Sequence, residues 1–307
     1  NPWFEKMAEA WMQPFSILWG CASSGKSHAL GLFTLLDYLE SPNETFSLLA
    51  STTKEMLMLR SFASVIQYLQ YLKANKQFEV PFKTVTQPLC VVPESVDETE
   101  VKGKILGVAV QQGTEQQARQ NMQGVHLPYS RLILDELAGM RPAAMATRSN
   151  MARCKDLKVM GASNPESFFD QCGLFSEPKA GWDSISSETL EWESHYGKVY
   201  RFDAFKSPVI EYPHRYPYLP DKASNDRIIQ MNKGNEDAPD VWVFLRAFPP
   251  AQANDLSMIS ELELKNCHAC DEMSEPWKKV IAKVAGFDPS YSSGGDNAVF
   301  VVGELGI

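Results

Sequence analysis

The sequence predicts an α/β fold in which helices cover both faces of a mostly parallel β-sheet. Over residues 15–165, short apolar runs typical of buried strands alternate with longer segments whose apolar residues recur at helical spacing. Several of these apolar runs end in glycine, in small polar residues or in acidic residues. The carboxyl ends of parallel strands meet at one edge of such a sheet, and ligands bind at that edge in open α/β folds.

The elements of the first half follow this alternation in order. Residues 2–12 carry apolar side chains at helical spacing and predict an opening helix. The next elements expected are a strand over 15–20, a helix over 26–40, a strand over 45–52 and a single helix over 54–75. After these come strands over 82–92, 103–112 and 130–137, a helix over 142–154 and a strand over 157–165.

The second half gives a weaker signal. The expected elements are a strand over 198–205, helices over 224–234 and 237–248, and a linker over 249–257. Residues 278–305 contain two apolar runs around a Gly/Ser turn, which predicts a β-hairpin opening a second domain. Because the chain lacks an initial Met and ends in a strand-like run, we expect it to be part of a longer protein.

Length and charge narrow the classes of protein to consider. The chain has 307 residues and a net charge of −9, with a pI near 5.2. This acidity argues against a surface coated with basic residues for nucleic acid, although a local patch is compatible with it. Residues 137–160 carry five basic side chains and one acidic one, and fit either a solvated helix face or a surface that meets phosphates. No apolar run is long enough to predict a membrane span.

The stretch WGCASSGKSHAL joins the 15–20 strand to the 26–40 helix with the spacing G-x-x-x-x-G-K-S. This is the P-loop pattern, and it predicts a P-loop NTPase of the RecA-like (ASCE) type, because glycines let successive backbone N–H groups point at phosphate oxygens. We expect the Lys26 ammonium to reach the β- and γ-phosphates of ATP and the Ser27 hydroxyl to bind Mg²⁺. The expected ATP-binding residues are Gly20, Cys21, Ala22, Ser23, Ser24, Gly25, Lys26 and Ser27.

The run RLILDEL predicts the second part of the same site. Asp135 and Glu136 stand at the end of an apolar strand, which in a parallel sheet faces the ligand crevice. We expect Asp135 to support the Mg²⁺ ion and Glu136 to polarise the water that attacks the γ-phosphorus. Asp135 alone would fit a kinase or a switch GTPase, whereas the Asp-Glu pair fits an ATPase that hydrolyses its substrate.

The run VMGASNP is a third strand that ends in small polar residues. Ser163 or Asn164 would hydrogen-bond the γ-phosphate or the attacking water and so couple hydrolysis to moving parts. The alternative is that Asn164 and the proline after it simply open a loop.

A transition-state arginine and an adenine slot are also expected. The arginine candidates are Arg119, Arg131, Arg141 and Arg148. Arg119 lies in a polar loop before the acid-ended strand and could reach a neighbouring subunit as a catalytic arginine finger. Trp11 and Gln13, just before the first strand, are candidates for the adenine contact. A helix that packs an aromatic stripe on the sheet would explain Trp11 equally well.

Four stretches, in the order LWGCASSGKSHAL, RLILDEL, GASNP and VAGFDPSYSSGGDNAVFVVG, resemble the large subunit of tailed-bacteriophage terminase, the genome-packaging motor. The first two are shared with many ATPases, whereas GFDPSYSSGGDNA resembles the opening hairpin of the family's RNase H-like nuclease. The resemblance runs from Trp3 to the C-terminus. It implies an ATPase domain over 1–254 with a lid or linker subdomain over 166–254, a linker over 255–277 and a truncated nuclease domain over 278–307.

The resemblance also implies partners and a second chemistry. The family translocates double-stranded DNA into a procapsid as a homo-oligomeric ring on the portal protein, with the terminase small subunit, in the host-cell cytoplasm. Its nuclease cuts concatemeric DNA with Mg²⁺ or Mn²⁺; Asp288 matches the first metal-binding carboxylate, and Asp296 is a weaker match. Two-metal hydrolysis needs several converging carboxylates, so the chain as given is expected not to cut DNA.

One departure from the family and two alternatives to it remain. Many family members carry an arginine inside the P-loop, but residues 21–24 here are Cys-Ala-Ser-Ser, which favours an arginine that reaches across subunits. The first alternative is a helicase or repair ATPase, in which GFDPSYSSGGDNA has no place. The second is an assembly subunit that binds nucleotide as a switch and does not turn it over.

Overall fold

The computed structural model describes residues 1–75, 79–98, 100–110, 127–250, 280–288 and 299–306. The chain divides into two compact units, Asn1–Pro250 and Ala251–Ile307. Each unit is described by itself below.

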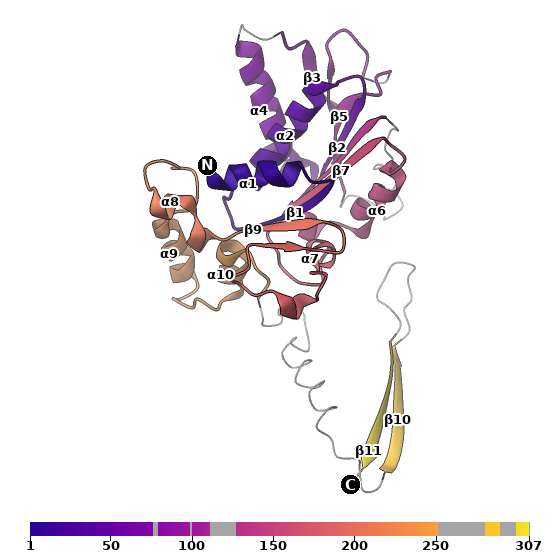
Figure 1. The fold of residues 1–307 in the computed structure, drawn as a ribbon, viewed down its shortest axis with the longest axis vertical. Helices are drawn as coiled ribbons and strands as arrows, with labels where there is room; N and C mark the ends of the chain where they lie inside the picture. The colour runs from indigo at the N-terminus through magenta and orange to yellow at the C-terminus, as the bar shows by residue number, and fades with distance from the viewer. Residues whose placement is uncertain (76–78, 99, 111–126, 251–279, 289–298, 307) are drawn as a thin grey trace. The chain divides into compact units, whose positions relative to one another are not determined.

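A nine-stranded sheet forms the centre of the first unit (Figure 1). Its strands are β1 (Phe15–Gly20), β2 (Thr45–Ser51), β3 (Phe82–Thr86), β4 (Leu89–Pro93), β5 (Lys104–Ala109), β6 (Tyr129–Asp135), β7 (Asp156–Ser163), β8 (Glu191–Glu193) and β9 (Lys198–Phe202). They lie in the order β3-β4-β5-β2-β6-β7-β1-β9-β8. Every pairing from β5 to β9 is parallel, and the strands at both edges pair antiparallel. The predicted α/β fold with a mostly parallel sheet is therefore confirmed.

Helices cover both faces of this sheet. The longer ones are α1 (Pro2–Trp11), α2 (Lys26–Glu40), α4 (Ser61–Ala74), α6 (Pro142–Met151) and α9 (Lys222–Met231). Shorter ones are α3 (Lys54–Leu59), η1 (Leu137–Gly139), α7 (Gln171–Ser176), η2 (Trp182–Ser184), η3 (Ala204–Lys206), α8 (Pro208–Glu211), α10 (Pro239–Val241) and the π-helix η4 (Trp242–Arg246). Among the described residues, none of the helices is both long and apolar enough to cross a membrane.

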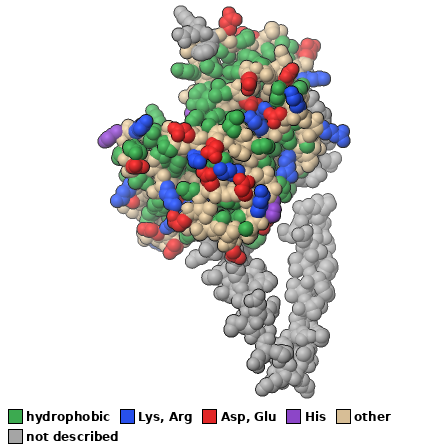
Figure 2. Space-filling view, viewed as in Figure 1, with side chains coloured by type: hydrophobic (Ala, Val, Ile, Leu, Met, Phe, Trp, Pro, Cys, Tyr) green, Lys and Arg blue, Asp and Glu red, His purple; other side chains and the backbone are tan. Residues whose placement is uncertain are grey.

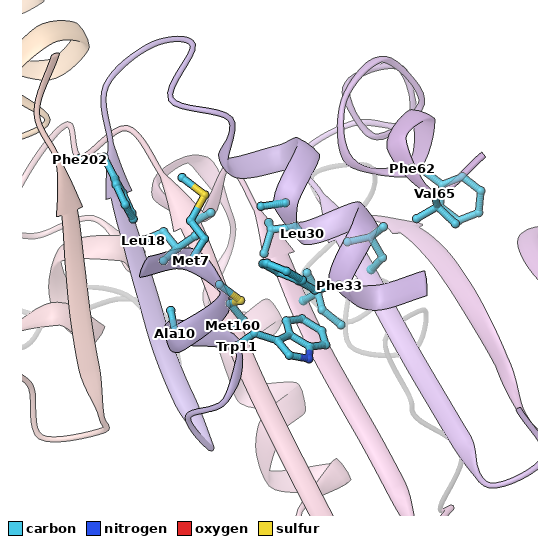
Figure 3. Packing of buried hydrophobic residues seen from close by; sticks show 14 of the residues in the cluster. Met7, Ala10, Trp11, Leu18, Leu30, Phe33, Phe62, Val65, Met160 and Phe202 are labelled. Atoms are coloured by element: carbon cyan, nitrogen blue, oxygen red, sulfur yellow. The ribbon is translucent and has the colours of Figure 1, made fainter. Parts of the chain in front are cut away.

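The alternation of side chains along the buried strands creates two hydrophobic cores. In β1, Leu18 joins a core formed with α1, α2 and α4, while Ile17 and Trp19 join a second core formed with α6 and α7. Figure 3 shows the first core, in which Met7 and Trp11 of α1 lie over the sheet beside the side chains of α2. A strand buried on both faces explains why 15–20 reads as a continuous apolar run.

Three expected elements need correction, and one short strand was not expected. The helix expected over 54–75 is broken at Arg60, whose φ and ψ of −122° and −100° separate α3 from α4. The strand expected over 82–92 is a hairpin, β3 and β4, because the chain turns at Gln87 and Pro88. The helix expected over 237–248 is α10 followed by the π-helical turn η4. The strand β8 was not expected, because three residues are too few to show an alternating apolar pattern. A helix break without Gly or Pro leaves no clear mark in an apolar periodic sequence.

The described part of the second unit is one antiparallel hairpin. Its strands are β10 (Val280–Asp288) and β11 (Val299–Gly306). The two strands predicted over 278–305 are therefore confirmed, and their RNase H-like assignment stays a prediction. The linker expected over 255–277 and the turn that contains Asp296 lie outside the described residues.

Charge is mixed on the surface of the first unit. On the face drawn in Figure 2, acidic and basic side chains are interspersed and no large area of one sign is visible. Within the basic segment 137–160, three side chains lie over aromatic rings. Arg148 lies over the rings of Phe15, Phe175 and Tyr196, Lys155 over Tyr129, and Lys158 over Trp11. These contacts support a structural role for the three side chains.

The crossing of α2 and α4 depends on a glycine, and this gives a stability prediction. A Cβ on Gly31 would lie 2.3 Å from the Ser61 carbonyl oxygen and 2.7 Å from the Ser64 Cβ. We expect Gly31→Ala to lower the free energy of unfolding by about 1–3 kcal/mol, because the two helices must move apart. Denaturant unfolding measures this change.

The control for this prediction is Gln70→Ala, on an exposed position of α4. It should change the free energy of unfolding by no more than about 0.5 kcal/mol. A Gly31→Ala protein as stable as wild type would show that the close crossing is not required.

Candidate functional site

The loop between β1 and α2 has the backbone that a P-loop needs. Ser23 and Gly25 have left-handed φ angles of 60° and 87°, which curl the chain just before the first turn of α2. Gly20 leaves room for the lysine that follows, since a Cβ there would lie 2.5 Å from the Lys26 Cδ. The loop is anchored from outside, because the Cys21 and Ala22 amides donate to the carbonyls of Phe202 and Phe244, each at 2.9 Å.

The Lys26 side chain is folded into the loop and buried. Its Nζ donates to the carbonyls of Gly20 and Cys21 at 2.9 and 3.0 Å, and lies 3.4 Å from the Asn164 Oδ1. Burial lowers the pKa of this ammonium to about 8. An anion in the loop would compensate this loss of solvation, so the arrangement favours a negatively charged ligand.

Ser27 and Asp135 meet across the edge of the sheet. The Ser27 hydroxyl donates to the Asp135 Oδ1 at 2.9 Å, although the two residues are far apart in the sequence. Asp135 is 1% exposed, and its Oδ2 is buried without a hydrogen-bond partner. Burial raises the pKa of this carboxyl, and the bond from Ser27 opposes the rise. A hydroxyl beside an orphaned carboxylate oxygen fits Mg²⁺, which is held in proteins by few protein ligands and several waters.

Glu136 follows in a left-handed conformation, with φ and ψ of 65° and 47°. This places it in the turn between β6 and η1, where its carboxylate forms an ion pair with Arg60. Sequence reasoning missed Arg60, because nothing in the periodic 54–75 segment marks a helix break there. The pair holds the expected water-activating carboxylate beside the start of α4.

The third strand end lies between the other two. β7 pairs with both β1 and β6, so the residues after β7 come next to the P-loop and to Asp135. Asn164 faces Lys26, and its Nδ2 is buried without a partner. Ser163 instead accepts a hydrogen bond from the Ala138 amide at 3.1 Å, and so fixes the turn that carries Glu136. Of the two predicted coupling residues, only Asn164 lies against the P-loop lysine.

A cavity of about 770 Å³ opens beside the loop. Its lining comes from α1, from the P-loop and start of α2, from α4 and from the segment before α9: Asn1, Phe4, Met7, Ser23, Ser24, Gly25, His28, Gln67, Tyr68, Tyr71, Tyr218 and Leu219. Neither Trp11 nor Gln13 is among these residues. Trp11 packs in the core, 5.7 Å from the Phe33 ring, and the role of Gln13 stays a prediction.

The remaining predicted site residues are placed as follows. Arg131 is 4% exposed and binds Asp37 and Asp156 at 2.5 and 2.9 Å, which makes it structural. Arg119 and Asp296 lie outside the described residues, and so does the side chain of Asp288. Within the described ranges no group of three His, Cys, Asp or Glu side chains could hold a metal ion.

The pKa of Lys26 gives a prediction for the nucleotide-free protein. A lysine whose pKa is lower in the folded state than the ordinary 10.5 contributes stability above pH 10.5, which is lost as the pH falls through about 8. We expect the free energy of unfolding of wild type, minus that of Lys26→Met, to rise by up to about 3 kcal/mol over this window. Denaturant melts at several pH values measure the difference, and a flat difference would contradict the burial argument.

Comparisons with known proteins were made for the sequence and for the fold. No protein-family model matches the sequence, and no curated protein matches it at the significance required. The large terminase ATPase domain of Thermus phage P74-26 is 13% identical with a TM-score of 0.50, over 79% of this chain and 92% of that one. The large terminase of a second, thermophilic bacteriophage, solved with ADP, is 13% identical with a TM-score of 0.52, over 99% of this chain and 64% of that one.

The chain thus spans less than two thirds of the ADP-bound large terminase but nearly the whole of the P74-26 ATPase domain. At 13% identity these similarities support the fold alone. The mostly parallel sheet with its P-loop at the end of β1 is the fold of the large terminase ATPase domains.

Proposed function

We propose that this chain binds and hydrolyses MgATP as the motor subunit of a viral DNA-packaging terminase. The observation that carries the proposal is the convergence of three strand ends on one loop. Ser27 contacts Asp135, and Lys26 contacts Asn164, across the carboxyl edge of the sheet. Ligands bind at this edge in open α/β sheets.

The residues divide the chemistry between them. Lys26 and the amides of the P-loop bind the β- and γ-phosphates, because they combine a buried cation with N–H groups on a curled backbone. Ser27 and Asp135 hold the Mg²⁺, which neutralises charge on the phosphates when bound. Glu136 accepts the proton of the attacking water once its carboxylate is released from Arg60. The Asn164 Nδ2, which is buried without a partner, donates a hydrogen bond to the γ-phosphate.

The packaging role rests on the fold. The solved large terminases of the thermophilic bacteriophage include complexes with ADP and with ATP-γ-S, which supports a nucleotide ligand for the same fold here. We propose the corresponding partners for this chain: double-stranded DNA, a portal, a small subunit and further copies of itself in a ring, inside the host cell. Residues 278–307 would begin a nuclease domain with Asp288 at its metal site, joined to the 1–254 ATPase domain through 255–277. Arg119 is the proposed finger between subunits.

The role of Glu136 gives the first test. We expect Glu136→Gln to bind MgATP within a fewfold of wild-type affinity and to lose roughly 10²–10⁴-fold in kcat, because the amide cannot take the proton. Steady-state ATPase assays and calorimetric titration with MgATP measure the two quantities. The matched control Glu193→Gln, on an exposed position of β8, should keep wild-type turnover. Wild-type turnover in Glu136→Gln would remove this residue from the role.

The second test separates a motor from a nucleotide switch. A packaging motor couples ATP hydrolysis to the movement of double-stranded DNA, so we expect this DNA to raise the kcat for MgATP. The assay compares turnover with and without DNA at low salt, since phosphate contacts weaken as salt rises. Tight MgATP binding without turnover in either condition would favour an assembly subunit that uses nucleotide as a switch.

A further inference from the structure

A chain of hydrogen bonds runs along the wall of the cavity next to the P-loop. His28 follows the loop on the first turn of α2, and its Nε2 lies 2.6 Å from the Tyr68 hydroxyl. The other ring nitrogen, Nδ1, lies 3.2 Å from the Ser64 Oγ. Ser64 in turn donates to the Arg60 carbonyl at 3.3 Å. Ser64 and Tyr68 are four positions apart in α4 and share one face of the helix, and Arg60 is its N-cap residue.

The direction of these bonds follows from counting protons. We assign the single hydrogen of the Ser64 hydroxyl to the Arg60 carbonyl, which can only accept, and Ser64 then accepts a hydrogen bond from His28. Nδ1 of the neutral ring is therefore the donor, and Nε2 is left as an acceptor. The Tyr68 hydroxyl must then donate to His28. Its oxygen keeps lone pairs that accept a hydrogen bond from something else.

The place of Tyr68 shows what that donor would be. Tyr68 and His28 both line the 770 Å³ cavity, which begins at Ser24 and Gly25 of the P-loop and extends between α1 and α4. If the phosphates occupy the P-loop, this adjoining cavity of about 770 Å³ has room for the nucleoside. Phe4 and Leu219, which are both partly exposed, offer apolar surface that a base would cover.

We propose that the Tyr68 hydroxyl, oriented by His28, accepts a hydrogen bond from the nucleoside of the bound nucleotide. The donor is a ribose hydroxyl or the amino group of the base, and the two share the same chemistry. His28 is then a positioning residue, and Tyr68 is a specificity-determining contact. This inference rests on the proposed function, because it takes the P-loop as the phosphate site.

The test compares a nucleotide with a ligand that has no nucleoside. We expect Tyr68→Phe to weaken MgATP binding by about three- to tenfold, the loss of one neutral hydrogen bond, and to leave Mg-tripolyphosphate binding unchanged. Calorimetric titration measures both affinities. Tyr212→Phe is the matched control, because Tyr212 is an exposed tyrosine that is not among the residues lining the cavity, and the variant should bind both ligands as wild type does. Thermal melts of the nucleotide-free variants check that each is folded.

Analogues then identify the donor. If it is a ribose hydroxyl, the 2′- or 3′-deoxy analogue of ATP binds wild type as weakly as Tyr68→Phe binds ATP, with no further loss in the variant. If the donor is the amino group of the base, purine riboside triphosphate, which lacks that group, binds wild type as weakly as Tyr68→Phe binds ATP, with no further loss in the variant. Either result supports the contact.

Other outcomes overturn the proposal. Unchanged MgATP affinity in Tyr68→Phe excludes the contact, and an equal loss for MgATP and Mg-tripolyphosphate shows that the hydroxyl acts on the phosphate site. An equal loss in the control Tyr212→Phe shows that the weaker binding does not come from a contact made by Tyr68. In all three cases wild type still binds both ligands, and the proposed function stands. A wild-type protein that binds neither MgATP nor Mg-tripolyphosphate overturns both.

Discussion

The site depends on one constraint: the Lys26 ammonium is buried in a loop of small residues, where backbone carbonyls are its nearest hydrogen-bond partners. Burying an uncompensated charge is expensive, so the loop must surround this group with acceptors. The carbonyls of Gly20 and Cys21 do so, and their positions follow from the curl at Ser23 and Gly25. A β-branched side chain at either of the two left-handed positions would oppose that curl. The local sequence is therefore small and polar for a physical reason.

The order of the strands brings the rest of the site to this loop. β7 lies between β1 and β6, so the ends of all three strands share one edge, and Ser27 meets Asp135 although 108 positions separate them. Asp135 and Asn164 reach the loop from there, and each keeps one buried polar atom without a partner. Such orphaned atoms are costly unless a ligand satisfies them. The site is thus arranged for binding and not for its own stability.

The sequence predicted these parts well where a local pattern carried the information. The P-loop spacing, the apolar run ending at Asp135 and the strand ending at Ser163 each describe a contiguous segment, and the sheet assembles them as expected. The break at Arg60 was not predicted, because neither Gly nor Pro marks it and the apolar period continues through it. The division of labour between Ser163 and Asn164 depends on which side chain faces which neighbour, and that is fixed only by tertiary register.

The missed break has a structural consequence that links the two ends of the site. Because α4 begins anew at Ser61, its first turn can approach α2 at Gly31, and Arg60 is left at the tip beside Glu136. From that tip the same helical face continues to Ser64 and to the wall of the cavity. The helix α4 thus begins directly after the residue that pairs with the carboxylate expected to activate water, and its later turns border the space expected to hold the nucleoside, so the break at Arg60 places both parts of the site along one element.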